Sequence, residues 1–188
     1  MAYFEDLSPY AYFRYPPSDR ETKNVGWLEI KHDFRKAAPT AETLDVLWEY
    51  CKISVEQTRG IHACELCPSG DSRRAERKGE NLTLGSSEIR VFGRDRVVYA
   101  APTLIFHYVS VHHYEPPEEF SRALSDGPRP PSPEYFESLE ELQLEWNQTY
   151  VLPVKPQRID SSRSSRDPMA RAKQPQSSND SQDDLSRV

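Results

Sequence analysis

Residues 62–67 read HACELC, which places Cys64 and Cys67 at a Cys-x-x-Cys spacing. Residues 107–113 read HYVSVHH, which places two histidines five positions apart. Two thiolates and two imidazoles form a complete tetrahedral ligand set for zinc, and both spacings are typical of structural zinc modules. We therefore predict one structural Zn²⁺ ion, bound by Cys64, Cys67, His107 and His112.

The choice of histidines has alternatives. His62 lies two positions before Cys64 and is the reserve ligand. On an ideal helix His107 and His112 are separated by about 140°, so the end of that helix has to loosen if both rings are to reach one ion. His113 projects about 100° away from His112 on the same helix.

Two other uses of a Cys-x-x-Cys pair remain open. A redox pair sits at the start of a helix, where the helix dipole activates the first thiol, whereas Pro68 and Gly70 break the chain after Cys67. A shell with only three protein ligands would leave a zinc-bound water for Glu65 or His113 to activate as general base. The nucleobase deaminase signature fails because the proline follows the cysteine pair, and we find no HExxH, P-loop, GxGxxG or GxSxG motif.

The composition predicts a cytoplasmic protein with reduced cysteines. The chain has three cysteines, an odd number, and no N-terminal stretch resembles a signal peptide. No apolar run approaches the roughly 20 residues that a membrane span needs. These features disfavour a secreted disulfide scaffold and a membrane protein.

The charge is unevenly distributed. The net charge is -6, and residues 154–188 contain seven basic and five acidic residues, a balance of +2, which leaves -8 for residues 1–153. An acidic domain repels phosphate backbones, so nucleic acid is a disfavoured partner. We expect residues 154–188 to be a disordered tail, because they are polar and rich in serine.

The first half of the chain predicts an arm, a strand and a helix. Six aromatic residues with interspersed prolines in the first fifteen positions indicate an extended arm that lays its rings on the domain. Alternating apolar residues predict a short strand over 25–30. His32, just after this strand, is expected to be a surface or hydrogen-bonded residue and not a metal ligand. Thr40 is a candidate N-cap for a helix over 41–52, on whose apolar face Cys51 is a buried residue.

The second half predicts a loop, a hairpin and helices. We expect a polar loop over 69–83, a β-hairpin formed by 87–91 and 97–101, a buried helix from Pro102 to Tyr114, and a short helix from Pro117 that Gly127 stops. Residues 125–133 are a Pro-rich linker. Residues 134–148 predict an amphipathic helix, which either docks on its own domain or binds a partner.

Together these elements predict an α+β fold. Residues 1–124 form a small zinc-stabilised domain, in which a knuckle, a hairpin and a helix make a treble-clef-like core with an additional N-terminal strand and helix.

Several blocks of sequence resemble a family of small bacterial proteins that share an uncharacterised domain. The blocks are YFEDLSPY at 3–10, the HxCxxC block at 62–67, and HYVSVH at 107–112 followed by PPEEF at 116–120. The resemblance covers residues 1–124 and implies that His62, Cys64, Cys67, His107 and His112 belong to the family pattern. It implies no activity.

The expected function is a non-enzymatic, zinc-stabilised module that binds another protein, as an accessory or immunity-type factor. The alternative is a zinc-dependent hydrolase or nuclease-like enzyme with a three-ligand site. The sequence does not specify the oligomeric state.

Overall fold

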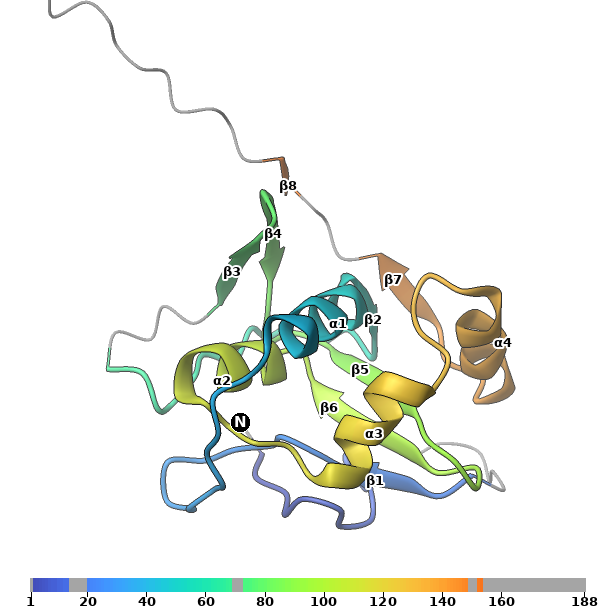
Figure 1. Cartoon of the computed structure of the whole chain (residues 1–188), viewed down its shortest axis with the longest axis horizontal. Helices are drawn as coiled ribbons and strands as arrows, with labels where there is room; N and C mark the ends of the chain where they lie inside the picture. Colours follow the sequence, from blue (N-terminus) through green and yellow to red (C-terminus); the bar gives the residue numbers. More distant parts are fainter. Residues whose placement is uncertain (1, 14–19, 69–72, 149–151, 154–188) are drawn as a thin grey trace, which may run out of the picture. The chain divides into compact units, whose positions relative to one another are not determined.

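Two neighbouring strands, Glu88–Phe92 (β5) and Val98–Pro102 (β6), form the middle of the main sheet. Both are buried along their whole length, and they pair as the predicted antiparallel hairpin, with Ile89 opposite Ala101. The computed structural model describes residues 2–13, 20–68, 73–148 and 152–153. Strands Thr22–Asn24 (β1), Ile53–Val55 (β2) and Trp146–Gln148 (β7) complete a five-stranded sheet in the order β1-β6-β5-β2-β7 (Figure 1). Only β1 and β6 run parallel among these neighbours.

Helix Ala41–Lys52 (α1) covers part of this sheet and has the bounds that its periodicity predicts. The Thr40 hydroxyl accepts a hydrogen bond from the Thr43 amide at 3.0 Å, which caps the helix as expected. Cys51 is fully buried on the inner face, where its thiol lies 3.6 Å from the Thr103 carbonyl oxygen. Cys51 is therefore a core residue.

The next two helices follow the sheet directly. Helix Ile105–His112 (α2) begins three residues later than predicted, because Pro102 ends β6 and Thr103 and Leu104 form a turn. A proline suits either the first turn of a helix or the end of a strand, so the sequence alone placed this boundary wrongly. Helix Glu118–Asp126 (α3) ends at Gly127 as predicted.

The prediction of a polar loop over 69–83 is wrong for residues 74–83, which form a β-hairpin. Strands Arg74–Arg77 (β3) and Glu80–Thr83 (β4) pair antiparallel, and Leu152–Pro153 (β8) adds a third strand to them. Lys78 and Gly79 both have positive φ, of 51° and 78°, which is the backbone of a tight hairpin turn. The charged composition concealed this hairpin, whose main inward residue is Leu82.

The N-terminal arm lies along β1 and the segment after it. The predicted strand over 25–30 is displaced, since β1 ends at Asn24 and Gly26 has a φ of +70°. Phe4 forms a bridge and an edge-on ring contact with Trp27, as expected for an arm that lays its rings on the domain. The surface position predicted for His32 is confirmed, and its ring stacks on Tyr3 at 3.6 Å.

The helix predicted over 134–148 is shorter than expected, with nine residues. Helix Pro133–Glu141 (α4) ends where Gln143 adopts a positive φ of 55°, and Trp146 belongs to β7. Tyr135 is fully buried and donates a hydrogen bond to the Arg90 carbonyl of β5 at 3.1 Å. This helix is docked on its own domain, and the predicted docking alternative is the correct one.

The described part of the chain is a mixed α+β structure with four helices. None of these helices has the length and apolar character that a membrane crossing requires. The tail predicted over 154–188 lies outside the described residues.

Candidate metal centre

The knuckle, residues 62–67, is fixed by main-chain contacts to the turn between β4 and β5. The His62 amide donates to the Gly85 carbonyl at 2.8 Å, and the Gly85 amide donates to the Thr103 hydroxyl at 2.9 Å. Gly85 has a φ of +89°, and a Cβ there would lie 2.2 Å from the His62 carbonyl oxygen. Only glycine permits this close approach, which positions the cysteines beside the start of α2.

The knuckle closes on itself as a turn. The Cys67 amide donates to the Cys64 carbonyl at 3.4 Å, which brings both sulfurs to the same side of the loop. Cys64 is buried and Cys67 is half-buried. The loop therefore presents two thiols toward the interior next to α2.

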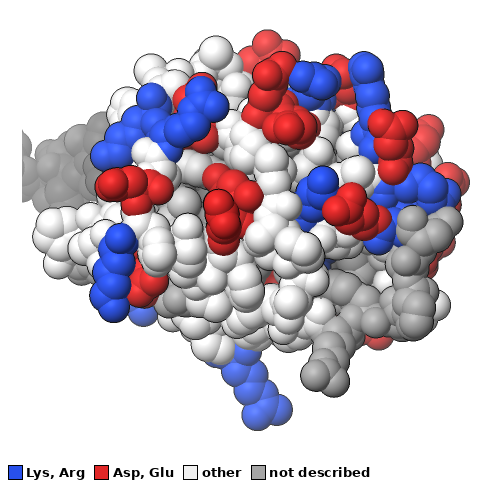
Figure 2. Space-filling model, turned by 90° about the horizontal axis from the view of Figure 1, so that it is seen from below, with Lys and Arg blue, Asp and Glu red and all other residues white. Residues whose placement is uncertain are grey.

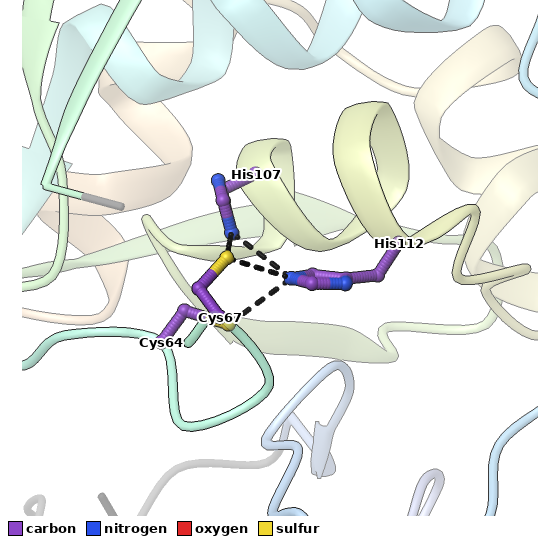
Figure 3. Close-up of side chains that lie close together, drawn as sticks. All are labelled: Cys64, Cys67, His107 and His112. Atoms are coloured by element: carbon purple, nitrogen blue, oxygen red, sulfur yellow. Dashed lines mark hydrogen bonds between the residues drawn. The ribbon is translucent and has the colours of Figure 1, made fainter. Parts of the chain in front are cut away.

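The end of α2 loosens in the way that two ligands five residues apart require. The amides of His113 and Tyr114 both donate to the Tyr108 carbonyl, so the last turn is wider than a regular α-turn. His113 has a left-handed backbone with a φ of 58°. A wider turn reduces the angle between His107 and His112, and both rings point toward the knuckle (Figure 3).

The four ligand atoms form one cluster. Each residue offers one atom, and all four atoms lie within 4.8 Å of one another. The Cys67 sulfur lies 3.2 Å from the Nε2 atoms of both His107 and His112, and these two nitrogens are also 3.2 Å apart. The Cys64 sulfur is 3.3 Å from Nε2 of His112. For zinc bonds of about 2.0 to 2.3 Å, the edges of a tetrahedron of these ligands are about 3.3 to 3.8 Å.

This geometry fits a metal ion between the four atoms. Two neutral imidazoles and two thiols face one point, so lone pairs on nitrogen and sulfur lie close together and repel one another. Few N–H or S–H protons are available to form hydrogen bonds between them. A cation removes this repulsion and replaces the thiol protons. The four side chains could therefore hold a metal ion, and sulfur together with imidazole suits zinc and other transition metals.

Burial sets the protonation of the cluster without metal. Desolvation, with a smaller effect of His112, lowers the pKa of His107 to about 4. Desolvation and then the Lys36 ammonium lower the pKa of His112. Desolvation raises the pKa of the Cys64 thiol to about 11. Both rings are therefore ready to coordinate at neutral pH, whereas the thiol at Cys64 has to release its proton when metal binds.

Comparison with known families finds a match for this chain. The model of a Domain of unknown function (DUF7919) matches residues 2–125. The chain belongs to the DUF7919 family. The matched residues contain the knuckle and all of α2, but they end before α4. No curated protein and no solved structure matches the chain.

The remaining candidate residues of this DUF7919 domain lie outside the cluster. His62 is not among the four clustered residues, although its main chain anchors the knuckle. His113 is exposed at the end of α2, and Glu65 is exposed at the tip of the knuckle. The structure thus gathers the four residues that the spacing selects and leaves the reserve ligand aside.

Sequence reasoning missed the residues that tie the N-terminal arm to the segment just after α2. The Asp6 carboxylate accepts hydrogen bonds from the Gly26 amide at 2.9 Å and from the Tyr114 hydroxyl at 2.7 Å. Burial raises the pKa of this carboxyl group, although both hydrogen bonds oppose the shift. Asp6 belongs to the YFEDLSPY block, so the aspartate in that block was the available signal.

Proposed function

We propose that this chain is a non-enzymatic, zinc-stabilised protein-interaction module with a treble-clef-like core. The observation that carries the proposal is the convergence of four protein ligand atoms, with two sulfurs and two ring nitrogens within 4.8 Å. Four protein ligands complete a tetrahedral shell and leave no position for a reacting water. Such a shell stabilises a fold and does not by itself catalyse a reaction.

The choice of zinc follows from the ligand types. Cys2His2 is a common structural zinc set, and zinc has no redox chemistry that would threaten the thiolates. A bound ion would join the knuckle to the end of α2, two segments about 40 residues apart in the chain. Metal binding would then be part of the folding free energy.

The interaction role is supported by the surface. The part of the chain before the tail carries an excess of acidic residues, and on the face in Figure 2 the described positive and negative side chains are interspersed. This arrangement does not favour a nucleic-acid backbone as partner. Large apolar side chains stand out of the surface at Ile30, Ile61 and Val111, with exposed fractions of 62, 50 and 53%. We propose a cytoplasmic accessory or immunity-type factor of bacterial origin.

The second candidate is a zinc-dependent hydrolase or nuclease-like enzyme, and one observation favours it. A surface hollow of about 500 Å³ lies beside His112, between the segment Lys36–Ala38 and His113. If His112 were exchanged for water, this hollow would admit a substrate, and His113 or Glu65 would serve as general base.

Metal-edge X-ray absorption on the purified protein separates the two functions. The structural proposal expects one zinc per chain with two sulfur and two nitrogen neighbours and no oxygen. A shell with one oxygen and three protein ligands would favour the enzyme. Native mass spectrometry of the wild type and of Cys64→Ser gives the metal content, and equal zinc in both proteins would contradict the assigned ligands.

A further inference from the structure

The surface hollow beside His112 differs in charge from the rest of the domain. Its lining comes from residues 36–38 on one side and from Val111, His112 and His113 at the end of α2 on the other. None of these residues is acidic and Lys36 is basic, although acidic residues outnumber basic ones before the tail. An anion in this hollow therefore meets no carboxylate in the lining.

Main-chain contacts fix the two sides of the hollow. Lys36 forms an isolated β-bridge with Tyr114, and the Ala37 amide donates to the His113 carbonyl at 2.9 Å. The lining is thus formed before any ligand arrives, which lowers the entropy cost of binding.

The ammonium group of Lys36 has no anionic partner in this hollow. Lys36 is exposed, and its Nζ lies 5.1 Å from the centroid of the Phe34 ring. In the part of the chain that the structure describes, no carboxylate lies within ion-pair distance of this ammonium. Its charge acts on His112, whose pKa is lowered by desolvation and then by Lys36. A bound carboxylate would give the ammonium a counter-charge.

His112 has a second ring nitrogen that the cluster does not use. Its Nε2 faces the sulfurs, whereas Nδ1 lies on the side of the ring away from them (Figure 3). No described residue forms a hydrogen bond with Nδ1, and Nδ1 is not among the buried polar atoms without a partner, so it is accessible to solvent. Once Nε2 binds a metal ion, the ring proton resides on Nδ1, which becomes a hydrogen-bond donor. Histidines that bind zinc commonly donate this proton to a carboxylate, a carbonyl or water.

An apolar rim adjoins these polar groups. Val111 is 53% exposed, and Ala37 and Ala38 are exposed in the same lining. An apolar side chain next to a bound carboxylate would remove this surface from water, which favours binding.

We propose that this hollow binds a carboxylate of a partner protein, together with an apolar side chain of the same segment. One carboxylate oxygen accepts the Nδ1 proton of His112, and the other pairs with the Lys36 ammonium. The apolar side chain covers Val111. A phosphate group is disfavoured, because its charge exceeds that of one ammonium and the surrounding domain is acidic. The partner role rests on the proposed function, whereas Lys36 and the shape of the hollow do not involve the metal.

The test is a titration of the full-length protein, prepared with zinc, with N-acetyl-L-leucine, which carries one carboxylate beside an apolar side chain. The expected result is saturable NMR shifts at the amides of Ala37 and Val111 and at Nδ1 of His112, with no change in zinc content. N-acetyl-L-leucinamide has the same shape without the charge and should bind about tenfold more weakly. Lys36→Gln should weaken binding of the acid by about threefold and keep its zinc.

A matched control is Lys78→Gln, which removes an exposed ammonium outside the hollow and should leave the titration unchanged. Equal binding of the acid and the amide, unchanged binding in Lys36→Gln, or an unshifted Nδ1 of His112 in the zinc-loaded protein would overturn the proposal. Preferential binding of inorganic phosphate would also overturn it, because the hollow would then select for anionic charge alone. These results would leave the metal proposal intact. A chain without zinc that still binds the acid through Lys36 would contradict the metal proposal and support the hollow.

Discussion

The sulfur of Cys67 lies 3.2 Å from Nε2 of His107, although 40 residues separate them in the chain. Cys67 is half-buried at the end of the knuckle, and His107 is buried on α2, so this contact joins the two segments. A shared ion would add a direct link between these two segments to the main-chain hydrogen bonds that already fix the knuckle through Gly85.

Cys67→Ser should therefore lose both the metal and a large part of the stability. With free metal at about 1,000 times its dissociation constant, binding stabilises the folded state by about 4 kcal/mol, and the variant should lose most of this. Urea unfolding with and without added zinc measures the difference. Cys51→Ala is the matched control, because it removes a cysteine from the core outside the cluster. It should keep one zinc per chain, and zinc loss in this control would refute the ligand assignment.

Replacing the two disputed histidines should have opposite consequences. His112→Ala removes a ring nitrogen from the cluster and should abolish tetrahedral cobalt absorption after Co²⁺ substitution. His62→Ala leaves the main-chain hydrogen bond to Gly85 in place and should bind cobalt with an unchanged spectrum. A tetrahedral spectrum lost in His62→Ala and retained in His112→Ala would mean that the reserve ligand is the true one.

Metal affinity should increase with pH at a defined slope. The pKa of His107 is lowered to about 4 and that of His112 is also lowered, so both rings are neutral around pH 7 and bind without releasing protons. The cysteines coordinate as thiolates, and the raised pKa of about 11 at Cys64 means that metal has to displace its proton. Around neutral pH the logarithm of the affinity should therefore rise by about two per pH unit, one for each thiol proton that the metal displaces. Competition titrations with a zinc chelator measure this slope. A slope near four would show that the histidines are also protonated in the metal-free protein.

The docked position of α4 predicts graded losses of stability around Tyr135. Tyr135→Phe removes only the hydrogen bond to the Arg90 carbonyl and should cost about 1 kcal/mol. Tyr135→Ala also empties the space between Tyr50 and Phe92, whose rings contact it edge-on, and should cost about 3 to 5 kcal/mol. Chemical unfolding of the zinc-loaded proteins measures both values. A chain that ends at Asp126 and melts at an unchanged temperature would contradict docking.

The spacing of cysteines and histidines in the sequence was enough to predict which four side chains come together. Two close cysteines and two histidines on one helix limit the geometry strongly, and the structure gathers the same four side chains. The widened last turn of α2 was needed but could only be stated as a requirement, because it depends on the carbonyl of Tyr108 accepting two amides. Such a choice between neighbouring hydrogen bonds is made by tertiary contacts.

The fold was predictable where apolar periodicity is strong, as in α1 and the β5–β6 hairpin. It was not predictable where few residues face inward, as in β3 and β4, or where a helix stops without glycine or proline, as α4 does at Gln143. The buried pair of Arg90 and Glu88, whose side chains are 2.7 Å apart, also contradicts simple apolar patterning. It is accommodated because the Tyr10 hydroxyl of the arm donates to Glu88 and its ring lies over Arg90.

The separation of 40 positions between Cys67 and His107 also has a consequence during synthesis. A ribosome adds about 5 to 20 residues per second, so the knuckle is made roughly two to eight seconds before His107. For that interval the nascent chain carries two thiols that can bind metal only incompletely, and small cellular thiols compete with them for the ion. If the domain binds zinc as proposed, it should therefore acquire the ion late, after α2 has emerged.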